Sequence, residues 1–311
     1  MEVINLCNRN PPCDYCYAYP FDGYVPSFEQ VKFFIDKTKR QVHPFEVIFL
    51  GGEPFLRKDM IKILEYSAET FAVRKTSISS NGTVFKYMTS EQIQRLKRLA
   101  DNGSVIQVSI DSATNPNTPK GIESLEGIGI LDRNGVSFRA GIVLTQQNYG
   151  DYLNTINVLL DLQTLRGINL EPLQKINDEY FFKNTLTNEQ MIGIKSSVLE
   201  LRKAKQREDV TIVGLVEHAE GDLRNKLMTR TNRGIELVDP KIINAGLYAN
   251  GDVSMNGTLG RAEIIGNLLS QDWKDIWHNA RTLYRKSIKQ ENKKRGSDPT
   301  IDTNQNGKIP Q

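Results

Sequence analysis

Residues 46–82, EVIFLGGEPFLRKDMIKILEYSAETFAVRKTSISSNG, contain the repeating unit that establishes the fold class. Two short runs of apolar and β-branched residues, 46–52 and 76–82, flank a segment at 59–71 whose apolar residues recur at helical spacing. A strand, a helix and a second strand in this order are typical of a parallel sheet, because parallel neighbours need a long crossover connection. We therefore expect an α/β protein.

The same alternation extends along the chain in both directions. Further strands are predicted at 2–6, 105–112, 137–145 and 167–173, and further helices at 27–41, 89–103, 121–134 and 150–165. Ser27 is placed to cap the first of these helices, and Gly103 to end another. Six strands with five intervening helices favour a partial (β/α)6 TIM-like barrel; a doubly wound open sheet is the competing architecture.

After residue 174 the alternation weakens. A helix is predicted at 187–206, a strand at 209–216, a hairpin around Asn250 and Gly251, and a last helix at 271–285. We therefore expect four parts. They are the barrel at 1–175, connecting helices and a strand at 176–242, a small C-terminal α+β cap at 243–286, and a disordered tail at 287–311.

The composition narrows the class of protein. The chain has 311 residues, of which 39% are hydrophobic, and a net charge of +3 at pH 7. No apolar run reaches the roughly 18 residues of a membrane span, and residues 1–6 lack the pattern of a secretory signal, so we expect a cytoplasmic protein. The charge is weak for a nucleic-acid-binding protein, and much of the basic excess lies at 281–296, which we interpret as a solvated helix end.

All three cysteines of the chain, Cys7, Cys13 and Cys16, lie within ten residues of one another. A reducing compartment argues against a structural disulfide, and three thiolates are too few for a four-thiolate zinc site. Three thiolates can hold three irons of a [4Fe–4S] cluster and leave the fourth iron open to a ligand that is not protein. A thioredoxin-type redox pair and buried, unreactive thiols are the alternatives, but neither accounts for Cys7.

The cysteine stretch CNRNPPCDYCY (7–17), followed by FLGGEP (49–54), resembles the radical S-adenosylmethionine (radical SAM) enzymes. Five residues separate Cys7 from Cys13, two more than in most of that family. The resemblance implies a [4Fe–4S] cluster on the three cysteines, with S-adenosylmethionine (SAM) at the open iron. It also implies a cofactor role for Tyr15, which fills the aromatic position before the third cysteine.

The resemblance extends to further segments in family order. It implies that the Gly-Gly-Glu-Pro motif binds the amino group of SAM, and that SISSNGT (77–83) and VSIDS (108–112) end the third and fourth strands near the cofactor. Without the resemblance, a turn and strand ends that meet water explain the same residues. The implied SAM-binding residues are Tyr15, Gly51, Gly52, Glu53, Pro54, Ser79, Asn81, Ser109, Asp111, Lys120, which stands where the family often has arginine, and Leu170.

Residues 243–277 resemble SPASM, the C-terminal module that carries auxiliary clusters in many peptide-modifying radical SAM enzymes. The cysteines of that module are missing, with Ile243 and Asn256 in their places. We therefore expect the module to fold without iron, as a cap or a platform for substrate. Trp273 and Trp277, one helical turn apart, are interpreted as core residues.

The resemblance implies an enzyme that cleaves SAM reductively to a 5′-deoxyadenosyl radical, which abstracts hydrogen from a substrate C–H bond. We expect the substrate to be a ribosomally synthesised peptide that is cross-linked, cleaved or rearranged. A small-metabolite substrate is the main alternative, and a non-catalytic iron–sulfur or zinc-binding module is a remote one. The implied electron donor is a flavodoxin- or ferredoxin-like reductant. We expect a leader peptide to be bound either by a partner protein or by the C-terminal region.

Overall fold

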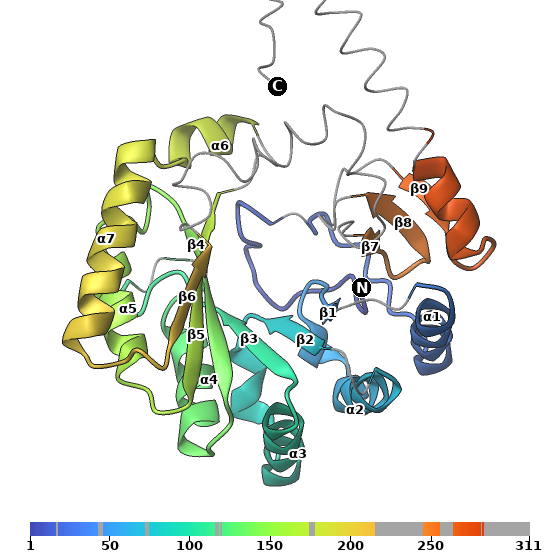
Figure 1. The fold of residues 1–311 in the computed structure, drawn as a ribbon, viewed down its shortest axis with the longest axis horizontal. Helices are drawn as coiled ribbons and strands as arrows, with labels where there is room; N and C mark the ends of the chain where they lie inside the picture. The colour runs from blue at the N-terminus through green and yellow to red at the C-terminus, as the bar shows by residue number, and fades with distance from the viewer. Residues whose placement is uncertain are drawn as a thin grey trace, which may run out of the picture.

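A computed structural model describes residues 1–16, 18–42, 46–71, 75–115, 118, 120–173, 178–214, 245–255, 264–280 and 282. Its main element is a sheet of six parallel strands in chain order. The strands are β1 (Glu46–Phe49), β2 (Lys75–Ser80), β3 (Val105–Ser109), β4 (Phe138–Leu144), β5 (Leu165–Pro172) and β6 (Thr211–Gly214). The sheet curves with its helices on the outer side, which confirms the partial barrel (Figure 1).

The helices form where the apolar spacing predicts them. They are α1 (Phe28–Gln41), α2 (Met60–Thr70), α3 (Ser90–Asp101), α4 (Ile122–Arg133), α5 (Tyr152–Leu160) and α7 (Asn188–Ala204), with a short α6 (Asp178–Asn184) that we did not expect. Two single 3-10 turns, η1 (Pro54–Leu56) and η2 (Thr83–Tyr87), follow the ends of β1 and β2. Ser27 caps α1 by accepting a hydrogen bond from the Gln30 amide at 3.1 Å, as its sequence position predicts.

The first expected strand, 2–6, is not a regular member of the sheet. Residues 1–6 run beside the chain that follows β1, but they form only one isolated bridge, between Glu2 and Leu50. The sixth strand is β6, which pairs with β5 and comes from the segment that we expected to connect the barrel to the cap. The parallel sheet therefore continues beyond residue 175.

A second, antiparallel sheet contains β7 (Ala245–Leu247), β8 (Asp252–Met255) and β9 (Ile264–Asn267). The turn between β7 and β8 contains Gly251 at a φ of +90°, so the predicted hairpin is confirmed. Residues 273–280 are helical. Ile243, Asn256 and the tail 287–311 lie outside the described residues.

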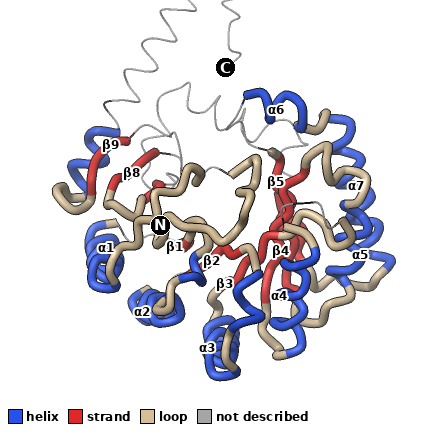
Figure 2. The backbone as a smooth tube through the Cα atoms, turned by 180° about the vertical axis from the view of Figure 1, so that it is seen from behind, coloured by secondary structure: helices blue, strands red, loops and turns tan. Residues whose placement is uncertain are grey.

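The small sheet is joined to α1 by an apolar cluster that includes Phe34, Val253 and Trp273, with Trp277 packed against it. Lys37 of α1 donates hydrogen bonds to the carbonyl oxygens of Leu268 and Gln271, at 3.1 and 2.8 Å. Figure 2, seen from behind, shows β8 and β9 on the α1 side of the barrel. No helix within the described ranges is long and apolar enough to cross a membrane.

Candidate active site

The concave side of the parallel sheet encloses a cavity of about 370 Å³. The N-terminal loop contributes Cys7, Cys13 and Cys16 to its lining, and all three are free thiols. The turn after β1 contributes Gly51 and Gly52, and alternate residues of β1 to β5 face inward below the loop. The cysteines and the carboxyl ends of the strands therefore share one cavity, as expected where ligands bind to parallel α/β folds.

Gly51 and Gly52 are required because the chain that leads to Cys7 passes directly against them. A Cβ atom at Gly51 would overlap the carbonyl oxygen of Ile4, and one at Gly52 would overlap that of Leu6 and lie 2.7 Å from the nitrogen of Cys7. The Gly52 amide donates to the Ile4 carbonyl at 3.1 Å. The two glycines thus position the first cysteine through the backbone alone.

Glu53 is fully buried, behind the cavity wall. One carboxylate oxygen accepts hydrogen bonds from the Phe55 amide at 3.1 Å and the Ser80 hydroxyl at 2.8 Å. The other accepts from the Asn81 amide at 2.6 Å. Burial raises the pKa of Glu53, against the lowering effect of these three donors. The side chain therefore ties the turn after β1 to the end of β2, and Glu53 does not line the cavity.

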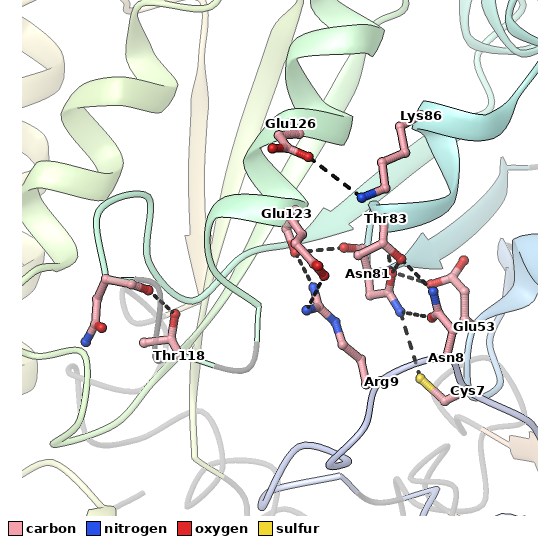
Figure 3. A network of polar contacts seen from close by, with 12 residues as sticks. Cys7, Asn8, Arg9, Glu53, Asn81, Thr83, Lys86, Thr118, Glu123 and Glu126 are labelled. Carbon is pink, nitrogen blue, oxygen red and sulfur yellow. Dashed lines mark hydrogen bonds and ion pairs between the residues drawn. The ribbon is translucent and has the colours of Figure 1, made fainter.

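Asn81, at the end of β2, connects the cysteine loop to the sheet (Figure 3). Its amide nitrogen donates to the Asn8 side chain at 2.9 Å and lies 3.8 Å from the Cys7 sulfur. Its side-chain oxygen accepts from the Thr83 hydroxyl at 2.7 Å, and Asn8 donates in turn to that hydroxyl at 2.8 Å. Asn81 thus holds Cys7 and Asn8 against the end of β2.

Arg9 extends this network to the start of α4, as Figure 3 shows. Its guanidinium donates to the Ser124 hydroxyl at 2.8 Å and forms an ion pair with Glu123 at 3.2 Å. The Ser124 hydroxyl donates to the carbonyl oxygen of Asn81 at 2.8 Å. Our sequence reasoning did not select Asn8 or Arg9, although both lie directly after Cys7 in a loop rich in polar residues.

Tyr15, Asp111 and Lys120 form a second polar group beside the cysteines. The Tyr15 hydroxyl donates to the Asp111 carboxylate, and the Lys120 ammonium lies 5.0 Å from the centre of the Tyr15 ring. Burial raises the pKa of Asp111, and Lys120 opposes that shift. Burial lowers the pKa of Lys120, but the negative charges of Asp111, Cys13, Glu171 and Cys16 together outweigh burial, and the pKa is raised. The other Asp111 oxygen is buried without a hydrogen-bond partner among the described residues.

The structure brings most of the predicted site residues together. Besides the three cysteines, the residues that line the cavity are Tyr15, Gly51, Gly52, Ser79, Asn81, Ser109 and Lys120. Glu53, Pro54, Asp111 and Leu170 do not line it. Leu170 is buried on the helix-covered side of β5, because its neighbours Asn169 and Glu171 take the inward positions.

The cysteines fit a [4Fe–4S] cluster by their chemistry and their placement. No three His, Cys, Asp or Glu side chains of the described chain converge to hold a single metal ion. A cubane cluster does not require such convergence, because each thiolate binds a different iron atom. Burial raises the pKa of the Cys7 and Cys13 thiols, and the positive charge of a bound cluster would favour their thiolate forms.

Comparison with known proteins agrees with this assignment. A family model described as Radical SAM superfamily matches residues 1–159, which is more than half of the chain, and the chain belongs to this superfamily of enzymes. Its members use a [4Fe–4S] cluster and SAM as cofactors.

Among relatives, an uncharacterized protein of Methanocaldococcus jannaschii is 25% identical over 287 residues, which cover 86% of this chain and 87% of that protein. A GTP 3′,8-cyclase of Actinobacillus succinogenes is 33% identical over 119 residues, 36% of this chain and 32% of the cyclase.

Two solved structures share the fold. Streptococcus suis SuiB, bound to the precursor peptide SuiA, has a TM-score of 0.66 at 13% identity. The match covers 89% of this chain and 63% of the SuiB chain. The enzyme anSMEcpe, with bound AdoMet and the Cp18Cys peptide, has a TM-score of 0.59 at 13% identity. The match covers 90% of this chain and 79% of the anSMEcpe chain.

Proposed function

We propose that this radical SAM enzyme modifies a ribosomally synthesised peptide at a single [4Fe–4S] cluster held by Cys7, Cys13 and Cys16. The observation that carries the site is the convergence of three free cysteines, Gly51 and Gly52 on one cavity. The peptide substrate is supported by the fold, because SuiB and anSMEcpe both hold peptides in structures that match about nine tenths of this chain.

The residues of the chain have distinct tasks in this proposal. The cysteines bind the cluster, the backbone around Gly51 and Gly52 faces the cofactor, and Lys120 supplies positive charge for its carboxylate. When bound, the cluster and SAM supply the radical chemistry of the family. The walls of the cavity would hold the reacting groups in a fixed orientation.

The number of cysteines limits the reaction outcomes that we propose. All three cysteines of this chain serve the cluster, so none of them returns a hydrogen atom to the substrate. We therefore propose cross-linking, cleavage or rearrangement as the outcome, rather than an epimerisation that ends at a thiol. A flavodoxin- or ferredoxin-like donor would supply electrons, and a partner protein or the C-terminal region would bind a leader peptide. The free thiols suit the reducing cytoplasm.

A small-metabolite substrate is the second candidate. It is favoured by the GTP 3′,8-cyclase, which is more similar in sequence than the peptide-bound structures, although the match covers only 32% of that enzyme. The two candidates share the cluster and SAM and differ only in the occupant of the cavity.

Anaerobic reconstitution tests the shared chemistry. We expect about four irons and four sulfides per chain, and 5′-deoxyadenosine that forms only with a reductant. Cys13→Ala should lose the cluster and this product, while circular dichroism reports that the chain still folds. One bound zinc without 5′-deoxyadenosine would refute the enzyme, and clearly more than four irons would refute a single cluster.

The substrate class needs a separate measurement. Short reading frames beside the gene should be expressed with the enzyme, and the peptides examined by mass spectrometry for a change in mass. A mass change that depends on Cys13 supports the peptide. Unchanged peptides, together with turnover of a small molecule from a cell extract, would establish the metabolite instead.

A further inference from the structure

The interior of the barrel is more polar than its architecture requires. Parallel barrels are usually filled with layers of branched apolar side chains. Here a majority of the inward positions on β1 to β5 are polar, and they lie below the level of the cysteine loop. They are Glu46, Lys75, Ser77, Ser79, Gln107, Ser109, Arg139, Asn169 and Glu171. The cavity therefore suits a polar group that enters from the carboxyl edge of the sheet.

Most charges along this cavity have partners within the chain. Glu46 accepts from the Ser77 hydroxyl at 2.5 Å and pairs with Lys75 at 3.2 Å. Glu171 accepts from the Asn169 amide at 2.6 Å, and the charge of Lys120 opposes the rise in the pKa of Glu171 that burial causes. Each of these charges therefore has a partner within the chain.

Arg139 differs from them. It lines the cavity and is only partly exposed, yet within the described ranges its guanidinium has no hydrogen bond and no ion pair. Its neighbours in the sheet are Gln107 on β3 and Gly167 on β5, neither of which carries a charge. A partly buried cation without an anionic partner leaves its five N–H donors for a ligand.

The strand register places Arg139 deeper in the barrel than Ser109, one of the residues assigned to SAM. Ser109 lies beside Gly141, two residues farther along β4 toward the carboxyl edge. Two residues of a strand span about 6.6 Å, so Arg139 lies one layer deeper than Ser109. Ser79 lies at the level of Arg139 through Gln107, but two strands away.

We propose that Arg139 binds a carboxylate of the substrate inside the barrel and so selects substrates with an acidic group. A guanidinium binds a carboxylate with two parallel hydrogen bonds, which fixes orientation as well as charge. In a peptide substrate this group is an aspartate or glutamate side chain; in a metabolite it is a free carboxylic acid. The inference rests on the proposed function, because it assumes that substrate enters this cavity.

Residue-resolved modification of arginines tests the proposal. The reconstituted enzyme with SAM is treated with phenylglyoxal, and mass spectrometry follows each arginine in the presence of glutarate, N-acetylglutamate methylamide, glutaramide or inorganic phosphate at equal ionic strength. Arg166 is the internal control, because it lies on β5 one residue before Gly167 and is exposed.

We expect either carboxylate to slow the modification of Arg139 at least threefold, and glutaramide to leave it unchanged. Stronger protection by N-acetylglutamate methylamide indicates a peptide side chain, and stronger protection by glutarate a small acid; both outcomes support the proposal. An Arg139 rate that no carboxylate changes overturns it. Protection by phosphate alone also overturns it, because the site would then bind a phosphate.

The proposed function fails in a different way. An enzyme that forms no 5′-deoxyadenosine refutes the radical chemistry even where Arg139 is protected. An enzyme that cleaves SAM normally but leaves Arg139 unprotected refutes only the carboxylate site.

Discussion

The carboxyl edge of the sheet and the interior of the barrel differ in one respect: an arginine at the edge is bonded to other described residues, and an arginine in the interior is not. At the edge, Glu53 accepts three hydrogen bonds, and Arg57 is buried and donates to Val3, Pro26 and Asp59. In the interior, Arg139 has no partner in the described part of the chain. The polar groups of the edge build the loop that holds the cysteines. In the interior, Arg139 is left for a group that the cavity admits.

Substitution of Gly52 should destabilise the carboxyl edge of the sheet more than any other change considered. In Gly52→Ala the new methyl group overlaps the Leu6 carbonyl, which belongs to the backbone and has no rotamer to change. We expect a loss of about 3 kcal/mol or more in the free energy of unfolding, together with loss of the cluster. Denaturant unfolding and iron analysis measure both.

Gly193→Ala is the matched control for Gly52→Ala. Gly193 lies on the exposed face of α7 with no atom within 4 Å of a Cβ, so the substitution should stabilise by about 0.5–1 kcal/mol. Equal effects of the two substitutions would contradict the close contact at Gly52.

Substitutions of Arg57 and Arg139 test the difference between the edge and the interior directly. Arg57→Gln should cost about 2–3 kcal/mol, because it removes charge-assisted hydrogen bonds from the buried carbonyls of Val3 and Pro26. Arg139→Gln should change the free energy of unfolding by no more than about 0.5 kcal/mol, since it breaks no contact within the described chain. A larger cost for Arg139→Gln than for Arg57→Gln would reverse the comparison.

Glu53→Gln should lower the free energy of unfolding by about 2 kcal/mol, no more than Arg57→Gln. The amide cannot accept from the Asn81 amide, the Ser80 hydroxyl and the Phe55 amide together, since one of its two groups donates. Thermal or denaturant unfolding measures the loss. Glu123→Gln is the control: its side chain is 61% exposed in the pair with Arg9, and the loss should stay below about 0.5 kcal/mol.

Local patterns predicted much of the fold. The cap of α1 at Ser27, the hairpin turn at Gly251 and the alternation of strands and helices depend on neighbours in sequence, and the structure confirms them. The choice between residues 2–6 and β6 as a sheet strand could not be predicted. Both are short apolar runs, and only tertiary pairing decides which of them joins the ladder.

The candidate site also has one part that the sequence predicted and one part that it did not. The sequence places Cys7, Gly51 and Gly52 in one cavity through the resemblance, and the structure brings them together. The sequence does not show the direction of the Glu53 side chain, because that direction depends on donors at the end of another strand. Arg139 carries no motif, and its significance appears only when the partners of each charge along the cavity are known.

The contact between Gly52 and Leu6 has a consequence for tolerance to mutation. Only main-chain atoms of Leu6 take part in it, and the Leu6 side chain is 43% exposed. A library that varies every position should therefore accept many residues at Leu6 and almost none at Gly52, although the two touch. Two touching positions would then differ sharply in variability among functional variants, and covariation between them would be too weak to reveal the contact.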